Sequence, residues 1–201
     1  MKKILALVLA LMLVLGTTAA FAEGMNIEIV SKGFQSTYWQ AVLKGAQAEI
    51  DALNGEAGYE MITMNFVGPD SESDIAQQVQ QFTNALNANP TGIGFAAVDQ
   101  EAFMDLLKEA VEKKIPIVGF DSGVPGAPEG AILANCATNN YNAGALAGEK
   151  VYEAIEDRIA AAEGTVRIGV SAQDAVSESV AQRGLGFIDK MAELCGEVAL
   201  E

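Results

Sequence analysis

The stretch NIEIVSKGFQSTYWQAVLKGAQAEI, residues 26–50, contains the pattern that decides the fold. It opens with a run rich in isoleucine and valine, which is typical of a β-strand. Apolar side chains then recur at helical spacing over residues 38–53. Thr37 and Gln40 have the spacing of a capping box, which predicts that the helix begins just before Tyr38. The stretch therefore predicts a strand followed by a helix, with aromatic side chains where the two meet.

The same alternation continues along the chain. Further strand-like runs lie at 59–66, 91–98, 115–120, 131–137 and 165–171, and further helix-like runs lie at 75–86, 100–114, 142–162 and 177–195. This order predicts an α/β protein with a parallel sheet and helices on both of its faces. The run IPIVGF at 115–120 is almost entirely apolar, which predicts a strand that is buried on both faces.

The segment 1–22 has the features of a secretory signal peptide. Two lysines precede an apolar run at 4–15, and small residues fit a cleavage site before Glu23. An uncleaved membrane anchor is the alternative, but the run is short for a span and its end is interrupted by glycine and threonine. No cysteine lies near the cleavage site to accept a lipid. We therefore expect an exported protein, periplasmic or extracellular, that is not lipid-anchored.

The composition excludes several classes of function. The chain has 12 basic and 27 acidic residues, a net charge of −15, so neither nucleic acid nor an anionic membrane is an expected partner. It has no histidine, which excludes Ser-His-Asp and Cys-His catalysis. The two cysteines, Cys136 and Cys195, are far apart in sequence, and we predict that both are buried free thiols. We expect no metal site and no cofactor, since the usual zinc and copper ligands and a GxGxxG phosphate loop are lacking.

Ligands of open parallel sheets bind beyond the carboxyl ends of the strands. A sugar offers a C–H face that stacks on aromatic rings, and hydroxyls that bond to carboxylate and guanidinium groups. Groups of this kind follow the predicted strands, which predicts a sugar site formed by Gln35, Ser36, Tyr38, Trp39, Asp121, Ser122, Asn140 and Arg183. The same edge also carries Asp99, Thr138, Asn139, Gln173 and Asp174.

The aromatic pair has a simpler interpretation as part of the core. Adjacent residues on a helix point about 100° apart, so Tyr38 and Trp39 cannot both lie on one narrow apolar stripe. Trp39 continues the stripe, and for it the core and the site are equally good interpretations. For Tyr38 the site is favoured.

The polar candidates also have structural alternatives. Asp121 follows a strand and precedes a loop, so no helix cap explains it and the site interpretation is favoured. Asp99 precedes a helix and fits an N-cap better than a ligand contact. Asn139 and Asn140 fit a turn or a cap as well as a site. For Arg183 the alternative is a surface ion pair.

Four motifs, GFQSTYWQAVLKGAQAEI, IPIVGFDSG, TNNYNAGALAGEKV and VAQRGLGF, occur in this order behind the predicted signal peptide. Together they make the chain, from about Asn26 to its end, resemble the sugar-binding proteins of bacterial ABC importers, the ribose-type group of periplasmic binding proteins. The resemblance implies the type I fold of that group, in which two α/β lobes joined by three crossovers close on a sugar. It also implies a monomeric, non-enzymatic protein whose partners are a monosaccharide or small polyol and a membrane permease.

The resemblance assigns roles to several residues. Tyr38 and Trp39 match the aromatic pair that stacks on the sugar, and Ser36 stands where an asparagine often contacts its hydroxyls. Asp121 matches the carboxylate that accepts from two hydroxyls, and Arg183 matches an arginine contributed by the second lobe. An indole that is sealed in the protein far from Asp121 would contradict this assignment.

Other positions qualify the resemblance. Asn140 falls in the first crossing between the lobes. Ser122 replaces an arginine and Ala96 replaces a polar residue, which argues against ribose itself but not against a sugar. We expect a complete first lobe at 23–137 and only the first part of a second lobe at 138–201. The second unit is either completed by another chain or cut short, and the latter is favoured. We therefore expect this chain to be a fragment that binds sugar weakly or not at all by itself.

Three other functions compete with transport. A sugar-responsive repressor shares the fold but needs a DNA-binding segment where this chain has its predicted signal peptide. An exported receptor that feeds a chemoreceptor or a sensor kinase is not separable from a transport protein by sequence. A secreted glycosidase needs a second catalytic carboxylate beside Asp121, and no sequence context provides one.

Overall fold

A computed structural model describes residues 24–58 and 61–196, and the predicted signal peptide lies outside them. Its centre is a five-stranded sheet in the order β2-β1-β3-β4-β5, in which every neighbouring pair is parallel. The strands are β1 (Met25–Val30), β2 (Ile62–Val67), β3 (Gly92–Phe95), β4 (Ile117–Phe120) and β5 (Ala134–Cys136). The predicted parallel sheet is confirmed.

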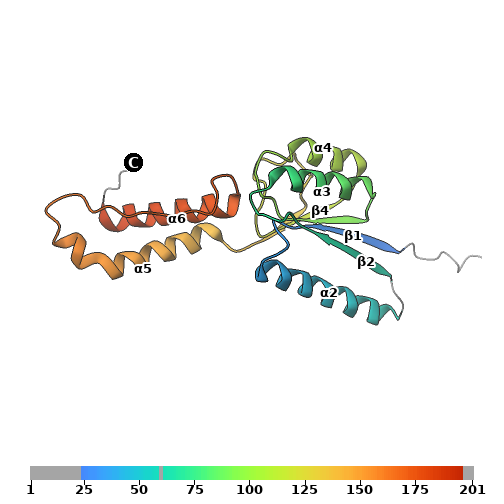
Figure 1. The fold of residues 1–201 in the computed structure, drawn as a ribbon, viewed down its shortest axis with the longest axis horizontal. Coiled ribbons are helices and arrows are strands. Elements are labelled where there is room, and N and C mark those ends of the chain that lie inside the picture. Colours follow the sequence, from blue (N-terminus) through green and yellow to red (C-terminus); the bar gives the residue numbers. More distant parts are fainter. Residues whose placement is uncertain (1–23, 59–60, 197–201) are drawn as a thin grey trace, which may run out of the picture.

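Helices cover both faces of this sheet. Helix α2 (Thr37–Ala57) lies on one face, and α3 (Ile75–Asn87) and α4 (Met104–Lys113) lie together on the other (Figure 1). The chain leaves β1 through α2 to reach β2, then crosses over through α3 to reach β3 on the other side of β1. The edge between β1 and β3 is therefore the point at which the strand order reverses, where ligands bind in such sheets.

The core is densest between the sheet and the α3–α4 layer. The rings of Phe82 and Phe95 have centroids 4.5 Å apart, and Phe103 contacts both. Ile117 of β4 faces this core and is fully buried, but Val118 points to the opposite face and is 47% exposed. Helix α2, on that opposite face, packs against β2 at the other end of the sheet. The prediction that the strand at 115–120 is buried on both faces is therefore wrong.

The helix start predicted from Thr37 and Gln40 is also wrong in its mechanism. Ser36 is the N-cap of α2, and its Oγ accepts from the backbone N–H of Trp39 at 3.4 Å. The Gln40 side chain donates instead to the carbonyl of Phe34 at 2.7 Å, which fixes the loop that leads into the helix. The helix begins one residue earlier than predicted.

After β5, α5 (Asn140–Ala160) and α6 (Glu178–Cys195) form a pair of helices that extends away from the sheet and from the helices that cover it (Figure 1). The strand predicted at 165–171 is wrong, because these residues are exposed and pair with no strand among those that the structure describes. A β-strand needs a neighbour to satisfy its backbone groups, and a β-rich sequence alone does not supply one.

Glycines allow α5 and α6 to touch. A Cβ atom on Gly144 would collide with the backbone carbonyl of Arg183, and one on Gly186 with the carbonyl of Tyr141. The two helix backbones therefore approach as closely as only glycine permits, which gives the motifs around 140–150 and 180–187 a packing role.

Both cysteines are free, as predicted, but both are exposed, so the predicted burial is wrong. Cys136 lies on β5, the edge strand, whose three residues are all exposed. Cys195 is the last residue of α6. Within the described part of the chain, no helix has the length and apolar character needed to cross a membrane.

Candidate functional site

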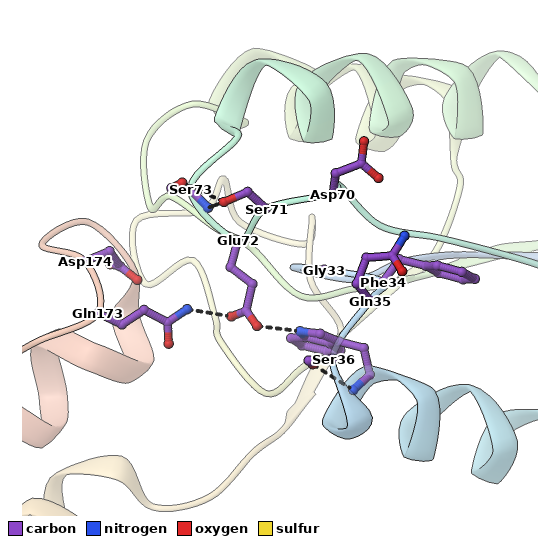
Figure 2. Close-up of a pocket in the computed structure, with 11 residues that line it drawn as sticks. Gly33, Phe34, Gln35, Ser36, Asp70, Ser71, Glu72, Ser73, Gln173 and Asp174 are labelled. Carbon is purple, nitrogen blue, oxygen red and sulfur yellow. Dashed lines mark hydrogen bonds between the residues drawn. The ribbon is translucent and has the colours of Figure 1, made fainter.

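A cavity of about 440 Å³ lies at the carboxyl edge of the sheet, beyond β1 and β2 (Figure 2). Its volume is within the range of small-molecule sites in proteins. Its lining comes from the loop after β1, the loop after β2 and a loop before α6, and consists of Gly33, Phe34, Gln35, Ser36, Trp39, Asp70, Ser71, Glu72, Ser73, Gln173 and Asp174.

Glycine shapes this cavity at two positions. A Cβ atom on Gly33 would lie 3.0 Å from the Trp39 ring and from the Cγ atom of Glu72. A Cβ on Gly68, in the loop after β2, would collide with the carbonyl of Gly33 and the hydroxyl of Ser31. The two loops therefore pass each other with no room for a side chain, which brings Glu72 next to the start of α2.

Trp39 is buried against this cavity, with only 1% of its side chain exposed. Its Nε1 donates to Glu72 Oε1 at 2.8 Å, and its ring meets Tyr38 edge-on with centroids 4.8 Å apart. The centroid of the Phe120 ring is 6.3 Å from that of the Trp39 ring, and Phe120 directly precedes Asp121 in the sequence. The indole is therefore enclosed, as the core interpretation predicts, yet it lies beside the strand that carries the predicted carboxylate.

Tyr38 and Asp121 meet directly. The phenol donates to Asp121 Oδ1 at 2.8 Å, and the Tyr38 side chain is 53% exposed. Asp121 has a φ of 59°, in the left-handed region that non-glycine residues seldom occupy. Its backbone N–H is held by the carbonyl of Cys136 at 3.0 Å. This backbone holds the carboxylate beside an exposed ring, which makes the pair a candidate for ligand binding.

Partial burial of its ring, together with the hydrogen bond and the negative charge of Asp121, raises the pKa of Tyr38 to about 12. The positive charge of Arg183 opposes this rise, which places the guanidinium within electrostatic reach of the phenol. A raised pKa favours the folded state below the ordinary tyrosine value of 10.0, and this contribution is lost as the pH rises through about 12.

We expect Asp121→Asn to lower the pKa of Tyr38 toward its ordinary value of 10.0, because the amide keeps the acceptor but removes the charge. Carbon NMR of labelled tyrosine side chains would measure it. Tyr141, whose pKa is raised by a hydrogen bond to Asp189, is the internal control and should titrate unchanged. A Tyr38 pKa that stays near 12 in the variant would show that burial alone causes the shift.

The other predicted residues, Ser122, Arg183 and Asn140, do not line the cavity. Ser122 is buried, and its Oγ accepts from the backbone N–H of Ser179 at 3.3 Å. Arg183 donates to the carbonyl of Ser179 at 3.1 Å. Asn140 is 4% exposed, and its Oδ1 is buried without a hydrogen-bond partner. Asn139 caps α5 by accepting from the N–H of Asn142, which confirms the cap interpretation for that residue.

Asp99 accepts from the backbone N–H groups of Glu101 and Ala102, at 2.8 and 2.7 Å. Asp99 therefore caps backbone N–H groups, as predicted. The capped segment, however, is a turn that precedes α4 and not the first turn of α4 itself. The eight predicted site residues are thus not gathered in one place. Gln35, Ser36 and Trp39 line the cavity, Tyr38 bonds to Asp121, Ser122 and Arg183 bond to Ser179, and Asn140 begins α5.

Two residues of this edge, Glu72 and Lys32, were not among the predicted site residues. Glu72 follows β2, and the rule of carboxyl ends that predicts the other candidates applies to it as well. Lys32 is 3% exposed, and its Nζ lies 3.5 Å from Ser179 Oγ. No sequence pattern distinguishes a buried lysine after a strand from an exposed one, so the burial of Lys32 could not be predicted.

Asp174, at the far side of the cavity, is held ionised. Burial by itself would raise its pKa, but hydrogen bonds from the backbone and hydroxyl of Ser177 outweigh this and lower the pKa below its ordinary value of 3.8. The positive charge of Lys32 adds to the lowering.

Among the described residues no group of three or more acidic, cysteine or histidine side chains is placed to hold a metal ion. The edge therefore offers hydroxyl, amide and carboxylate groups beside an aromatic ring.

Comparison with known proteins places the chain in a family. The model of the periplasmic binding protein domain family matches residues 27–200. The ribose import binding protein of Haemophilus influenzae is 24% identical over 164 residues, which make up 78% of this chain and 50% of that protein.

Two solved structures are similar over a comparable length. An ABC transporter solute-binding protein from Agrobacterium vitis with bound D-fucose is 32% identical, with a TM-score of 0.71 over 84% of this chain and 53% of that one. A Brachyspira murdochii protein described as an ABC transporter, LacI family transcriptional regulator is 37% identical, with a TM-score of 0.70 over 85% of this chain and 52% of that one.

The chain spans about half the length of these relatives. The family model nevertheless covers nearly all of the described residues, and the sheet has the parallel order expected from the sequence. This chain belongs to the periplasmic binding protein domain family and has its type I fold.

Proposed function

We propose that the protein is an extracytoplasmic solute-binding protein that captures a monosaccharide or similar small polyol and delivers it to the permease of an ABC importer. The observation that carries this proposal is the pairing of an exposed phenol with the carboxylate of Asp121 at the carboxyl edge of the sheet. Such a pair offers a flat ring and a strong acceptor to a sugar, and no histidine or metal-binding cluster of the described residues offers catalysis. The relatives named for ribose import and bound D-fucose support a sugar as the ligand.

In this proposal the ligand site is formed by Gln35, Ser36, Tyr38, Trp39, Asp121, Ser122, Asn140 and Arg183, some in contact with the ligand and some behind it. Asp121 accepts from sugar hydroxyls, and Arg183 donates to the sugar from the side of α6. Asn140 supports a contact because its buried Oδ1 has no partner in the structure, and a buried acceptor is costly until a donor reaches it. Tyr38 is the accessible ring, so it presents the first stacking surface, and Trp39 supports it from behind.

The remaining features of the proposal follow from the sequence. Segment 1–22 directs export and is removed, which leaves the mature protein periplasmic or extracellular, monomeric and without a lipid anchor. Residues 23–137 form the first lobe and 138–201 belong to the second. The alternative is an exported receptor that passes the occupied state to a chemoreceptor or a sensor kinase, and a neighbouring permease gene would favour transport.

We expect binding of the correct sugar to change the fluorescence of Trp39, the only tryptophan of this chain, because the ligand lies against the Tyr38–Trp39 pair. The complete protein, without its signal peptide, would be titrated with ribose, D-fucose and other monosaccharides, and Trp39→Phe would isolate the contribution of this indole. Tyr38→Ala should weaken binding by about tenfold or more, since one aromatic stacking surface is lost. Wild-type affinity in both Tyr38→Ala and Trp39→Ala would contradict the assignment.

A further inference from the structure

The carboxylate of Glu72 is shared between two parts of the molecule. Its Oε1 accepts from the indole Nε1 of Trp39 at 2.8 Å, and its Oε2 accepts from the side-chain amide of Gln173 at 3.0 Å (Figure 2). Trp39 belongs to α2 of the first lobe, whereas Gln173 lies on the loop that precedes α6. Both carboxylate oxygens are therefore occupied, one by each side of the cavity.

The loop that carries Gln173 touches the sheet edge at further points. Lys32 Nζ and the Ser122 hydroxyl both meet Ser179, at 3.5 Å to its Oγ and 3.3 Å to its backbone nitrogen. The Gln100 side chain donates to the carbonyl of Val176 at 3.1 Å. Residues 173–179 therefore lie along the carboxyl ends of several strands, and the Glu72 contact is the one that also reaches the aromatic pair.

We propose that Glu72 is a positioning residue that couples closure of the cavity to the placement of the Trp39 indole. The proposal rests on the proposed function, in which that indole supports the ligand-stacking ring. Charge-assisted hydrogen bonds are stronger than neutral ones, and a partly enclosed carboxylate is stable only while its oxygens are satisfied. When Gln173 withdraws, water must reach Glu72 to replace the lost donor. The carboxylate then turns toward solvent, and the indole loses its fixed acceptor.

Gln173 makes neither a hydrogen bond nor a ring contact with Trp39 among the described residues, so an effect of Gln173 on the indole would have to pass through Glu72. Gln173→Glu places two carboxylates against each other across the cavity, and the like charges repel. If Glu72 transmits this change, hydrogen exchange of the Trp39 indole N–H, measured by NMR without sugar, should accelerate by about tenfold. The scattering radius of the protein should increase as the loop withdraws.

The reciprocal double variant tests the direction of the contact. In Glu72→Gln with Gln173→Glu, the new amide at 72 still accepts from the indole through its oxygen. It also donates to the new carboxylate at 173, so the bond between residues 72 and 173 is restored with donor and acceptor exchanged. We expect its radius to return to the wild-type value. Its indole exchange should be slower than in Gln173→Glu but faster than in the wild type, because the acceptor at 72 is now a neutral amide. Ala175→Glu adds the same charge at an exposed position of the same loop and is the matched control, for which neither quantity should change.

The proposal is overturned if Gln173→Glu exchanges its indole proton within about twofold of the wild type, a change too small to report the loss of a charge-assisted hydrogen bond. A double variant that exchanges as fast as the single variant overturns it equally. Both readouts are made without ligand, so they are independent of the proposed function. Failure of the wild-type protein to bind any sugar would remove the function and leave the coupling intact, whereas unaltered exchange beside normal sugar binding would remove only the coupling.

Discussion

The variant Asp121→Asn is expected to lower the sugar affinity of the complete protein by about 100-fold, since two charge-assisted hydrogen bonds weaken to neutral ones. Asparagine is the informative replacement because it tolerates the left-handed backbone that the φ of 59° imposes, whereas most residues would add strain there. Its oxygen still accepts from the Tyr38 phenol, so the aromatic ring keeps its position. Calorimetric titration with the sugar identified by fluorescence would measure the loss.

Asp105→Asn is the matched control for this experiment. Asp105 lies on α4, is exposed and pairs with Lys108 at 2.8 Å, so the same chemical change is made in a surface ion pair. Such pairs contribute little, and sugar affinity should be unaffected. If the sugar affinity of Asp121→Asn is within about threefold of the wild-type affinity, the change is smaller than the loss of one charge-assisted hydrogen bond would cause. That result would show that this carboxylate does not contact the ligand.

The sheet was predictable because its evidence is local. The strands from β1 to β4 are short apolar runs separated by helices whose stripes are visible in the sequence, and that order admits few topologies. The run at 165–171 has the same local signature, yet it finds no partner among the described residues. Pairing is a tertiary property, so a β-rich sequence predicts a strand only when a neighbouring strand is present.

The site was predictable to the extent that it follows strand ends. Tyr38 and Asp121 are 83 residues apart in sequence and form a hydrogen bond, as the rule for carboxyl ends suggests. The partners of Trp39 were not predictable, because they depend on how closely the loops at Gly33 and Gly68 pass each other. That approach brings Glu72 to the indole and closes the ring off from solvent.

Gln78 of α3 is a polar side chain that is fully buried. Its amide donates to the carbonyls of Ser31 at 2.7 Å and Ala96 at 2.8 Å, and its oxygen accepts from the N–H of Val98 at 2.9 Å. One side chain thus ties together the loops that follow β1 and β3. Gln78→Leu keeps most of the volume and leaves three buried backbone groups without partners, so we expect a loss of about 3–5 kcal/mol in the free energy of unfolding.

Denaturant unfolding followed by circular dichroism would measure this loss, with Gln80→Leu as the control. Gln80 lies on the same helix but is exposed and bonds only to Asn84, so its replacement should change stability by no more than about 0.5 kcal/mol. A Gln78→Leu protein within about 1 kcal/mol of the wild type would mean that water satisfies the three groups.

Comparison of two replacements separates hydrogen bonding from packing at this position. Gln78→Glu also keeps the volume, but it turns a carboxylate toward the carbonyls of Ser31 and Ala96 in place of the donating amide. If the hydrogen bonds are what matters, glutamate should destabilise the protein at neutral pH at least as much as leucine, and part of the loss should be recovered in acid. There the protonated side chain regains a donor. The informative comparison is in acid, where both side chains are neutral: if packing alone matters, the glutamate and leucine variants should be equally stable there. Since Ser31 precedes the loop that lines the cavity, the same amide that stabilises the sheet also fixes the edge that is proposed to bind the ligand.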